Sequence, residues 1–469
     1  MKKTKIVCSI GPSTQTWENF KGLVEAGMNV ARINFSHATL EERRIDEELV
    51  ERANKELGAN IAILYDTKGP DLRTCSFEND TIELIAGNTI RIVEDEIMGT
   101  KDAICFNYRG VVKDLKKGMN VLLDDGFYKL IVESEDSDGG VTCRIVNSGI
   151  IKSRRGVCIP GIKLDVPYVS EKDEEDIKYA CEKDGDYLAI SFVNSADDIK
   201  QVKALCAKYG KPNMPIISKV ETEYAMNNLD EIVEESDVIM IARGDLGIET
   251  GVENLPLYQQ MMIDKCRAKG KSVIMATQMM TSMKNNIRPT NAEVTDVANA
   301  VLSGCDAVMT SDETTIGKYP VETIKNMAEI CERVESYYKY NDKYTHELND
   351  IAPIMAKNVV STSDDLDTKV IVAASMTGYT AKLISNLRPN AFILAIVSNE
   401  KVAKSLNLSY GVYPVVTGKY NSTDELVNDG KNQAKKYFDV KEDESIIITG
   451  GFPNPAQEQV INFMKIERM

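Results

Sequence analysis

The sequence is short of histidine and of closely spaced cysteines. It has two histidines, which excludes a histidine-rich metal site, and no two of its ten cysteines form a CxxC or zinc-knuckle pattern. No apolar run approaches a membrane span, and no low-complexity segment or short repeat is present. The net charge of −16 argues against binding to nucleic acid or to anionic membranes. We therefore expect no nucleic-acid and no membrane partner, and any anionic ligand must find a local basic site.

The cysteines lie mostly in apolar stretches, as Cys8, Cys266, Cys305 and Cys331 do. This pattern is typical of reduced core residues in a cytosolic protein. The N-terminal stretch MKKTKIVCSIGP is positively charged, but its apolar run is too short for a signal peptide. We therefore expect a cytoplasmic protein.

Strand and helix patterns alternate along most of the 469 residues, a length that predicts two to four domains. Many of the amphipathic stretches end in glycine, and Thr290 with Glu293 fits a capping box. Eight strands with intervening helices predict a parallel (β/α)8 barrel. The predicted strands are 5–10, 29–35, 61–66, 187–193, 215–221, 237–243, 272–278 and 306–311, and the clearest helices are 16–27, 40–58, 195–210, 256–270, 290–304 and 321–338.

The barrel pattern is interrupted once and followed by a second alternating region. Short β-type runs such as TIELIAG and TIRIVED replace the helical pattern and predict an inserted all-β domain. The runs TKVIVAAS, AFILAIV, YPVV and ESIIITG predict a smaller α/β domain at the end. The predicted division is barrel 1–70, inserted domain 71–168, barrel 169–340 and C-terminal domain 341–469.

Residues 31–37, ARINFSH, place polar side chains at alternate positions of a predicted buried strand. Arg32, Asn34 and Ser36 therefore share one face near the strand's end. A buried polar row needs partners, which either the chain or a ligand must supply.

Other predicted strands end in a similar way, and the active sites of such barrels lie at the C-terminal ends of the strands. Lys219 and Glu221 alternate on the fifth strand, so they share a face. We expect these polar groups to converge at one barrel mouth. The remaining candidates are Asp66, Thr67, Lys68 and Arg73 after the third strand, Arg243, Gly244, Asp245 and Glu249 after the sixth, Thr277 and Gln278 after the seventh, and Ser311, Asp312 and Glu313 after the eighth.

These groups suit phosphoryl transfer, in which positioning and charge neutralisation do most of the work. Glu221 and Asp245 suit a hard divalent cation such as Mg²⁺. Arg32, Lys219 and Arg73 supply positive charge for a phosphoryl group. Oxygens from Asn34, Ser36 and Asp66 suit a monovalent cation.

Each signal alone has a plainer interpretation. Lys219 and Glu221 form a pattern that is commonly a solvated pair, and Gly244-Asp245 is ordinary turn chemistry. The row that begins at Arg32 is also compatible with an interface or a structural ion-pair network. The convergence of several strands on one mouth favours a single site.

The sequence resembles the pyruvate kinase family over nearly its whole length. The motifs that carry the resemblance, in order, are TKIVCSIGP, NVARINFSH, DTKGPDLRT, LDDG, SRRGVCIPG, ISKVET, IMIARGDLGIE, VIMATQM, RPTNAEVTDVANAV and SDET. The resemblance implies transfer of a phosphoryl group from phosphoenolpyruvate to ADP, with Mg²⁺ or Mn²⁺ and K⁺ as cofactors. It also implies a homotetramer and a lid role for the inserted domain.

The resemblance also implies roles for residues. Lys219 would stabilise the transferring phosphoryl group, and Arg32 would bind its oxygens. Thr277 would lie near the carbon that is protonated. The other implied roles are Glu221 and Asp245 for magnesium, Asn34, Ser36, Asp66 and the Thr67 carbonyl for potassium, Gly244 and Asp245 at a helix N-terminus for the substrate carboxylate, and Asn34, His37, Arg73 and Arg155 for the nucleotide.

A second anion site is predicted in the C-terminal domain, where hydroxyls and backbone N–H groups meet at a helix start. Its residues are Ser375, Thr377, Gly378 and Thr380, and simple helix capping is the alternative. The family places a phosphorylated effector here. The final segment 450–469 lacks the Trp and Arg that hold fructose 1,6-bisphosphate in some members, so the effector's identity stays open.

Several positions depart from the family pattern. Asp71 stands where Glu is commoner in potassium-dependent members, Asn194 and Asn291 replace arginines, and Asp312 replaces a glycine. We expect the lost arginines to lie on helical or loop surfaces. Two other functions stay open: a different barrel enzyme of phosphoenolpyruvate or enolate chemistry, and a non-catalytic sensor of sugar phosphates.

Overall fold

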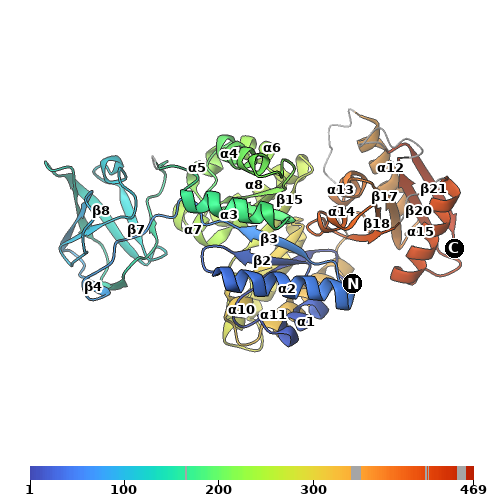
Figure 1. Ribbon diagram of the computed structural model, residues 1–469, viewed down its shortest axis with the longest axis horizontal. Coiled ribbons are helices and arrows are strands. Elements are labelled where there is room, and N and C mark those ends of the chain that lie inside the picture. Colours follow the sequence, from blue (N-terminus) through green and yellow to red (C-terminus); the bar gives the residue numbers. More distant parts are fainter. Residues whose placement is uncertain (164–165, 340–349, 418–419, 421, 452–460) are drawn as a thin grey trace.

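The computed structural model describes residues 1–163, 166–339, 350–417, 420, 422–451 and 461–469, and its three parts lie in a row (Figure 1). The barrel lies in the centre, the inserted all-β part on one side, and the C-terminal α/β part on the other. The predicted boundary at 340–341 falls outside the described residues. A search of the described helices finds none that is long and apolar enough to cross a membrane.

Eight parallel strands close into a barrel, which confirms the predicted architecture. Each strand pairs with the next one in chain order, and β1 pairs with β16 to close the circle. The pairing of β2 with β3 sets Asn34 directly opposite Asp66. The barrel strands are β1 (Lys5–Ser9), β2 (Val30–Asn34), β3 (Ala62–Asp66), β12 (Tyr187–Ile190), β13 (Ile216–Val220), β14 (Val238–Ala242), β15 (Ser272–Ala276) and β16 (Ala307–Thr310).

Helices surround the barrel, and their ends follow local capping rules. The predicted capping box of Thr290 and Glu293 forms at the start of α9, and glycines in the left-handed conformation end α1, α2 and α9. Helix α3, just after the inserted domain, was not among the predicted helices. The helices are α1 (Trp17–Ala26), α2 (Leu40–Leu57), α3 (Glu171–Glu182), α4 (Ala196–Lys208), α5 (Glu223–Asn227), α6 (Leu229–Glu235), α7 (Arg243–Thr250), α8 (Leu255–Ala268), α9 (Asn291–Ser303), α10 (Asp312–Thr315) and α11 (Pro320–Tyr337).

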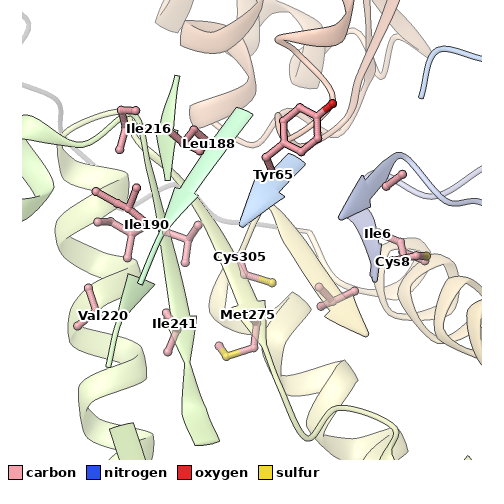
Figure 2. Packing of buried hydrophobic residues seen from close by; sticks show 14 of the residues in the cluster. Ile6, Cys8, Tyr65, Leu188, Ile190, Ile216, Val220, Ile241, Met275 and Cys305 are labelled. Carbon is pink, nitrogen blue, oxygen red and sulfur yellow. The ribbon is translucent and has the colours of Figure 1, made fainter. Parts of the chain in front are cut away.

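Alternate residues of each strand pack into two different cores. One core lies between strands and helices and includes Cys8 of β1 and Ile190 of β12 (Figure 2). The other fills the barrel interior and includes Val7 of β1 and Ile217 of β13. This alternation follows from the period of two in a strand, and it fixes which residues point into the barrel.

The inserted domain, here called the lid, leaves the barrel after β3 and returns before α3. It contains the predicted β-runs and three further short strands, β6, β10 and β11, that were not predicted. Its own core includes Leu84, Ile92 and Leu123. Its strands are β4 (Thr81–Leu84), β5 (Thr89–Val93), β6 (Ala103–Cys105), β7 (Asn120–Leu123), β8 (Tyr128–Glu135), β9 (Val141–Ile145), β10 (Gly149–Lys152) and β11 (Val157–Cys158).

The C-terminal domain has a five-stranded sheet that packs against the N-terminal end of the barrel. Four strands are parallel and were predicted, whereas the antiparallel edge strand β21 was not. Leu408 of this domain belongs to the core inside the barrel, so it closes the base. The elements are α12 (Ile351–Asp365), β17 (Val370–Ala374), α13 (Tyr379–Asn386), β18 (Phe392–Val397), α14 (Glu400–Lys404), β19 (Val412–Val416), α15 (Thr423–Phe438), β20 (Ser445–Gly450) and β21 (Phe463–Arg468).

Candidate active site

Polar residues continue the inward-facing rows of the strands at the barrel mouth. Val30 lies in the interior core, and Arg32, two residues later, shares its face. On β13 the same alternation runs from Ile217 to Lys219 and Glu221. The alternating polar residues of ARINFSH are therefore the top of a row whose lower part is core, although Ser36 lies beyond the strand and is exposed.

Arg32 is buried and held in place by two neighbouring strands. Its Nε donates to Asp66 Oδ2 at 2.7 Å, and its Nη1 donates to Ser9 Oγ at 2.7 Å. Burial alone would raise the pKa of Asp66, but the positive charges of Lys219 and Arg32 hold it below its usual value. Asp66 therefore stays ionised and fixes the guanidinium at the mouth.

Lys219 contacts three other residues of the cluster. Its Nζ donates to Ser191 Oγ at 2.7 Å and lies 3.1 Å from Glu221 Oε1 and 3.5 Å from Asp66 Oδ1. Burial acts to lower the pKa of Lys219, but the two carboxylates outweigh it and raise the pKa above 10.5. The ammonium therefore stays charged inside the barrel.

The negative charges of Glu221 and Asp245 are only partly offset by the nearby Lys219 ammonium. Burial raises the pKa of Glu221 to about 7, and the charge of Asp245 adds to that effect. Burial also raises the pKa of Asp245, whose carboxylate has no ion-pair partner among the described residues. Such a pair fits a divalent cation, which offsets both charges and takes further oxygens from ligands and water. Within the described part of the chain, no group of three or more His, Cys, Asp or Glu residues is placed to hold a metal ion.

Thr277 lies in a strained turn that the start of α7 supports. Its φ of 64° is rare for a β-branched residue, and Gln278 after it has a φ of 56°. Arg243 Nε donates to the Thr277 carbonyl at 3.1 Å, and the same guanidinium is bound by Asp296 at 2.8 Å. The Gly244 N–H, in the first turn of α7 as predicted, donates to Thr277 Oγ1 at 2.9 Å. The threonine hydroxyl is therefore fixed as an acceptor, and its own hydrogen is available to a ligand.

The predicted potassium donors lie on neighbouring strands. Asn34 is opposite Asp66, and Thr67 follows directly. Asn34 Oδ1 accepts the Ser36 N–H at 3.0 Å, and the Thr67 carbonyl accepts Ser191 Oγ–H at 2.7 Å. The potential ligand atoms are all oxygens, and one of the groups is a carboxylate, which fits a monovalent cation.

A cavity of about 350 Å³ opens beside this cluster, between the lid and the barrel. Its lining includes Asp245 and the three predicted nucleotide residues His37, Arg73 and Arg155, whereas Asn34 is not part of the lining. Lid residues such as Asp125 and Ile159 form the opposite wall. The mouth therefore holds a charged cluster next to a space that a nucleotide-sized ligand can enter.

Comparison with known families decides between the possible barrel enzymes. Residues 1–324 match the model of the pyruvate kinase barrel domain, and residues 354–467 match that of the pyruvate kinase alpha/beta domain. The chain belongs to the pyruvate kinase family.

Individual pyruvate kinases are similar over the whole chain. The pyruvate kinase of Geobacillus stearothermophilus is 40% identical over 472 residues, covering 99% of this chain and 80% of the relative. That of Clostridium acetobutylicum is 35% identical and covers 100% of this chain and 99% of the relative. The crystal structure of a pyruvate kinase from Cryptosporidium parvum has 34% identity and a TM-score of 0.94, covering 100% of this chain and 96% of that one.

Two departures from the pyruvate kinase pattern lie at the mouth. Asn194 was expected on a surface, but it is half-buried and lines the cavity, where its Oδ1 accepts from Thr222 Oγ1 at 2.7 Å. It therefore lies in a loop, as expected, and faces the cavity. Asp71 also lines the cavity, and its carboxylate pairs with Arg73 at 2.6 Å and Lys68 at 3.8 Å.

The other two departures are at helix starts. Asn291 is the exposed first residue of α9. Asp312 begins α10 and pairs with Lys284 at 2.8 Å, a favourable place for an acidic residue.

Two serines of the cluster were not among the predicted site residues. Ser9 binds Arg32, and Ser191 lies between Lys219 and the Thr67 carbonyl. Both lie at the ends of strands from which no candidate was taken. The signal was present, since each stands two residues after an inward-facing Val7 or Ala189.

The predicted effector residues lie far from this cluster, where β17 leads into α13. Ser375 and Thr380 are buried, and Gly378 occupies the N-cap with a φ of 85° and no side-chain cap. Residues 452–460 of the final segment fall outside the described residues.

Proposed function

We propose that this chain transfers the phosphoryl group of phosphoenolpyruvate to ADP, giving pyruvate and ATP. Membership of the pyruvate kinase family supports this reaction. The observation that carries it is the Lys219 ammonium, held 3.1 Å from Glu221 and 3.5 Å from Asp66 in the charged cluster at the barrel mouth. A fixed cation at this point lowers the energy of a transition state whose charge is spread over phosphoryl oxygens.

Arg32 and Lys219 bind and neutralise the phosphoryl group in this proposal. Both side chains are anchored by Asp66, so they need no rearrangement when charge develops. Glu221 and Asp245 would hold Mg²⁺ or Mn²⁺, and Asn34, Ser36, Asp66 and Thr67 would hold K⁺; pyruvate kinases generally use Mg²⁺ and K⁺. When bound, these ions supply further positive charge at the phosphoryl oxygens.

Thr277 completes the reaction in this proposal by passing a proton to the enol carbon through a water molecule. Its Oγ1 is turned by the Gly244 N–H, which supports donation of its hydrogen towards the substrate side. Protonation yields the ketone, which draws the transfer towards ATP. Gly244 and Asp245 lie in the first turn of α7, where backbone N–H groups suit the substrate carboxylate.

The lid closes over ADP and excludes water in this proposal. His37, Arg73 and Arg155 line the cavity and would contact the nucleotide. Asn34, which is not part of the lining, would contact it from the end of β2. The division of the chain at 70, 168 and 340 follows these roles.

Regulation and assembly are further parts of the proposal. Ser375, Thr377, Gly378 and Thr380 would bind a phosphorylated effector, supported by the uncapped start of α13. A homotetramer rests on the family alone. A cytoplasmic location is supported by the ten cysteines, all of which are described and none of which forms a disulfide.

A coupled assay of pyruvate formation, run with and without ADP, tests the activity. The expected result is pyruvate only when phosphoenolpyruvate, ADP and Mg²⁺ are all present. Pyruvate formed without ADP would indicate a different phosphoenolpyruvate enzyme. Phosphate-ester binding without any pyruvate would indicate a sensor.

A further inference from the structure

A second cavity, of about 700 Å³, lies on the lid side of the hinge between lid and barrel. Its lining includes four cationic residues and two acidic ones. The cationic residues are Lys68, Arg73, Arg109 and Arg154, and the acidic residues are Glu94 and Glu96. None of the roles proposed above uses this space.

Three chain segments that line this cavity are hydrogen-bonded to one another through their backbones. The Cys75 N–H donates to the Cys105 carbonyl at 2.9 Å, and the Arg154 N–H donates to the Cys75 carbonyl at 3.2 Å. On the next residues along, the Asn107 N–H donates to the Arg73 carbonyl at 3.0 Å. Three separate segments are therefore fixed side by side, which fixes where the main chain of Arg73 and Arg154 lies.

The cationic side chains have more charge than their neighbours neutralise. Arg109 makes no hydrogen bond or ion pair with any described residue. Arg154 donates from Nε to Ser76 Oγ at 3.1 Å, a neutral partner, and its guanidinium has no acidic partner among the described residues. Glu94 is the acceptor for the Gly110 N–H. Asp71, outside the lining, pairs with Arg73 at 2.6 Å and with Lys68 at 3.8 Å, so Arg109 and Arg154 are the cations of the lining that have no acidic partner among the described residues.

We propose that this cavity binds a small anion that carries two or more phosphate groups. Arg109 and Arg154 would contact its phosphates, since guanidinium groups bind phosphate oxygens in bidentate fashion. Ile97 and Phe106 also line the cavity, so an organic portion has an apolar surface to contact. The volume suits a ligand of metabolite size.

Arg73 lines both this cavity and the one beside the catalytic cluster. An anion in the second cavity would draw the Arg73 guanidinium towards itself and repel the phosphates of a nucleotide. The occupied second cavity would therefore weaken ADP binding, a consequence that rests on the proposed function. Binding itself does not rest on it.

Calorimetric titration of the full chain with inorganic triphosphate, in the absence of divalent cations, tests the site. Wild type is expected to bind at two sites, one in each cavity. Arg109→Gln and Arg154→Gln should each weaken one site at least tenfold. The control Arg144→Gln removes a lid arginine that pairs with Glu133 outside both cavities, and it should bind like wild type. Arg155→Gln should weaken only the other site.

A single site that Arg155→Gln abolishes and Arg109→Gln leaves unchanged would overturn the proposal. The coupling is then measured as the KM for ADP with and without triphosphate at fixed free Mg²⁺. Because triphosphate also enters the cavity assigned to ADP, part of the rise in KM is direct competition. Arg109→Gln should keep that part and lose the remainder, while basal kcat stays unchanged. If triphosphate binds as expected but no pyruvate kinase activity is found, the binding site stands and the proposed function fails.

Discussion

Two buried lysines lie at opposite ends of the same barrel, and their environments differ sharply. Lys219 is at the C-terminal mouth, between the carboxylates of Asp66 and Glu221. Lys5 is at the N-terminal base, where its Nζ donates to the Val412 carbonyl at 2.5 Å and lies 4.4 Å from the ring centre of Tyr413. One lysine faces charge next to a cavity, and the other faces the backbone and an aromatic ring of the next domain.

The pKa values of the two lysines shift in opposite directions. That of Lys219 is raised, because its two carboxylates outweigh burial. Burial lowers the pKa of Lys5 to about 7, and the ammonium of Lys2 adds to the lowering, while Glu335 opposes it weakly. The comparison shows that burial alone does not indicate function. A cluster of buried charged groups beside a cavity is the better indication of a functional site.

Other contacts at the base follow the same pattern as Lys5. Arg388 is buried and pairs with Asp306 at 2.9 Å, its Nη2 donates to the Gly304 carbonyl at 2.7 Å, and Leu408 closes the interior core. Polar groups here find partners across the domain junction. The base therefore contributes to stability, as expected for this end of a (β/α)8 barrel.

The largest expected effect distinguishes Lys219 at the mouth from Lys5 at the base. Lys219→Met is expected to lower kcat about 10³-fold, since removal of one preorganised group that stabilises transition-state charge has an effect of roughly this size. Substrate binding should change much less. Initial rates and binding by calorimetry check both, and Lys5→Met serves as the control with kcat near wild type. Near-normal kcat in Lys219→Met would remove this lysine from the mechanism.

Lys5→Met should instead change stability. Because the folded-state pKa of Lys5 is below that of the unfolded chain, the unfolded chain binds more protons between about pH 7 and 10.5. The free energy of unfolding should therefore rise with pH across this window. Below pH 7 the whole destabilisation caused by burying the Lys5 ammonium should be present. The substitution is expected to stabilise the protein by about 3 kcal/mol at pH 7. Urea unfolding at pH 7 and pH 10 checks this; an unchanged pH dependence in the variant would contradict it.

Glu221→Gln or Asp245→Asn should raise the Mg²⁺ concentration needed for half-maximal rate by about tenfold or more, because each removes one of two anionic ligands. The matched control is Glu234→Gln, an exposed carboxylate paired with Lys269. The measurement is initial rate against free Mg²⁺. Titration curves that coincide for wild type and both variants would place the metal elsewhere.

The smallest expected effect concerns potassium. Wild type should be activated several-fold by K⁺ over Na⁺ at equal ionic strength, which must be matched because screening alters attraction between charged groups. Asp71→Lys should lower this requirement, since an ammonium near the mouth can replace the cation. Asp71 pairs with Arg73 and Lys68, so the new lysine must also be accommodated beside two cations. Full wild-type activity without K⁺ would rule out the potassium site.

The barrel and the charged mouth were predictable because both follow from the alternation of side chains between the two faces of a β-strand. Inward-facing residues of a parallel barrel strand alternate, so Lys219 and Glu221 had to share a face. The same rule would have found Ser9 and Ser191. The lid strands β6 and β11 were missed because they have only three and two residues, too few to show a hydrophobic pattern. Strand β10 was missed because it offers only the adjacent pair Ile150 and Ile151 and no alternation.

Contacts across domains were less predictable. The sequence did not indicate that Leu408 enters the barrel core or that Asn194 lines the cavity, because both depend on how a loop turns rather than on local periodicity. Asp71 was assigned near the potassium donors by its position in a motif, whereas its partners are two flanking cations. Ion pairs of exposed side chains follow geometry that spacing does not encode.

The insertion of the lid between two paired strands has a consequence for folding. Strands β3 and β12 are neighbours, although about 120 residues separate them. The two ends of the lid are joined by a bridge between Arg73 and Gly156. A lid that has already folded therefore shortens the effective loop about threefold, which reduces the entropy cost of closing the barrel by about 1 kcal/mol. Barrel closure should accordingly be faster when the lid folds first. A substitution in the lid core that unfolds the lid should therefore slow barrel folding, although the substituted residue makes no contact with the barrel.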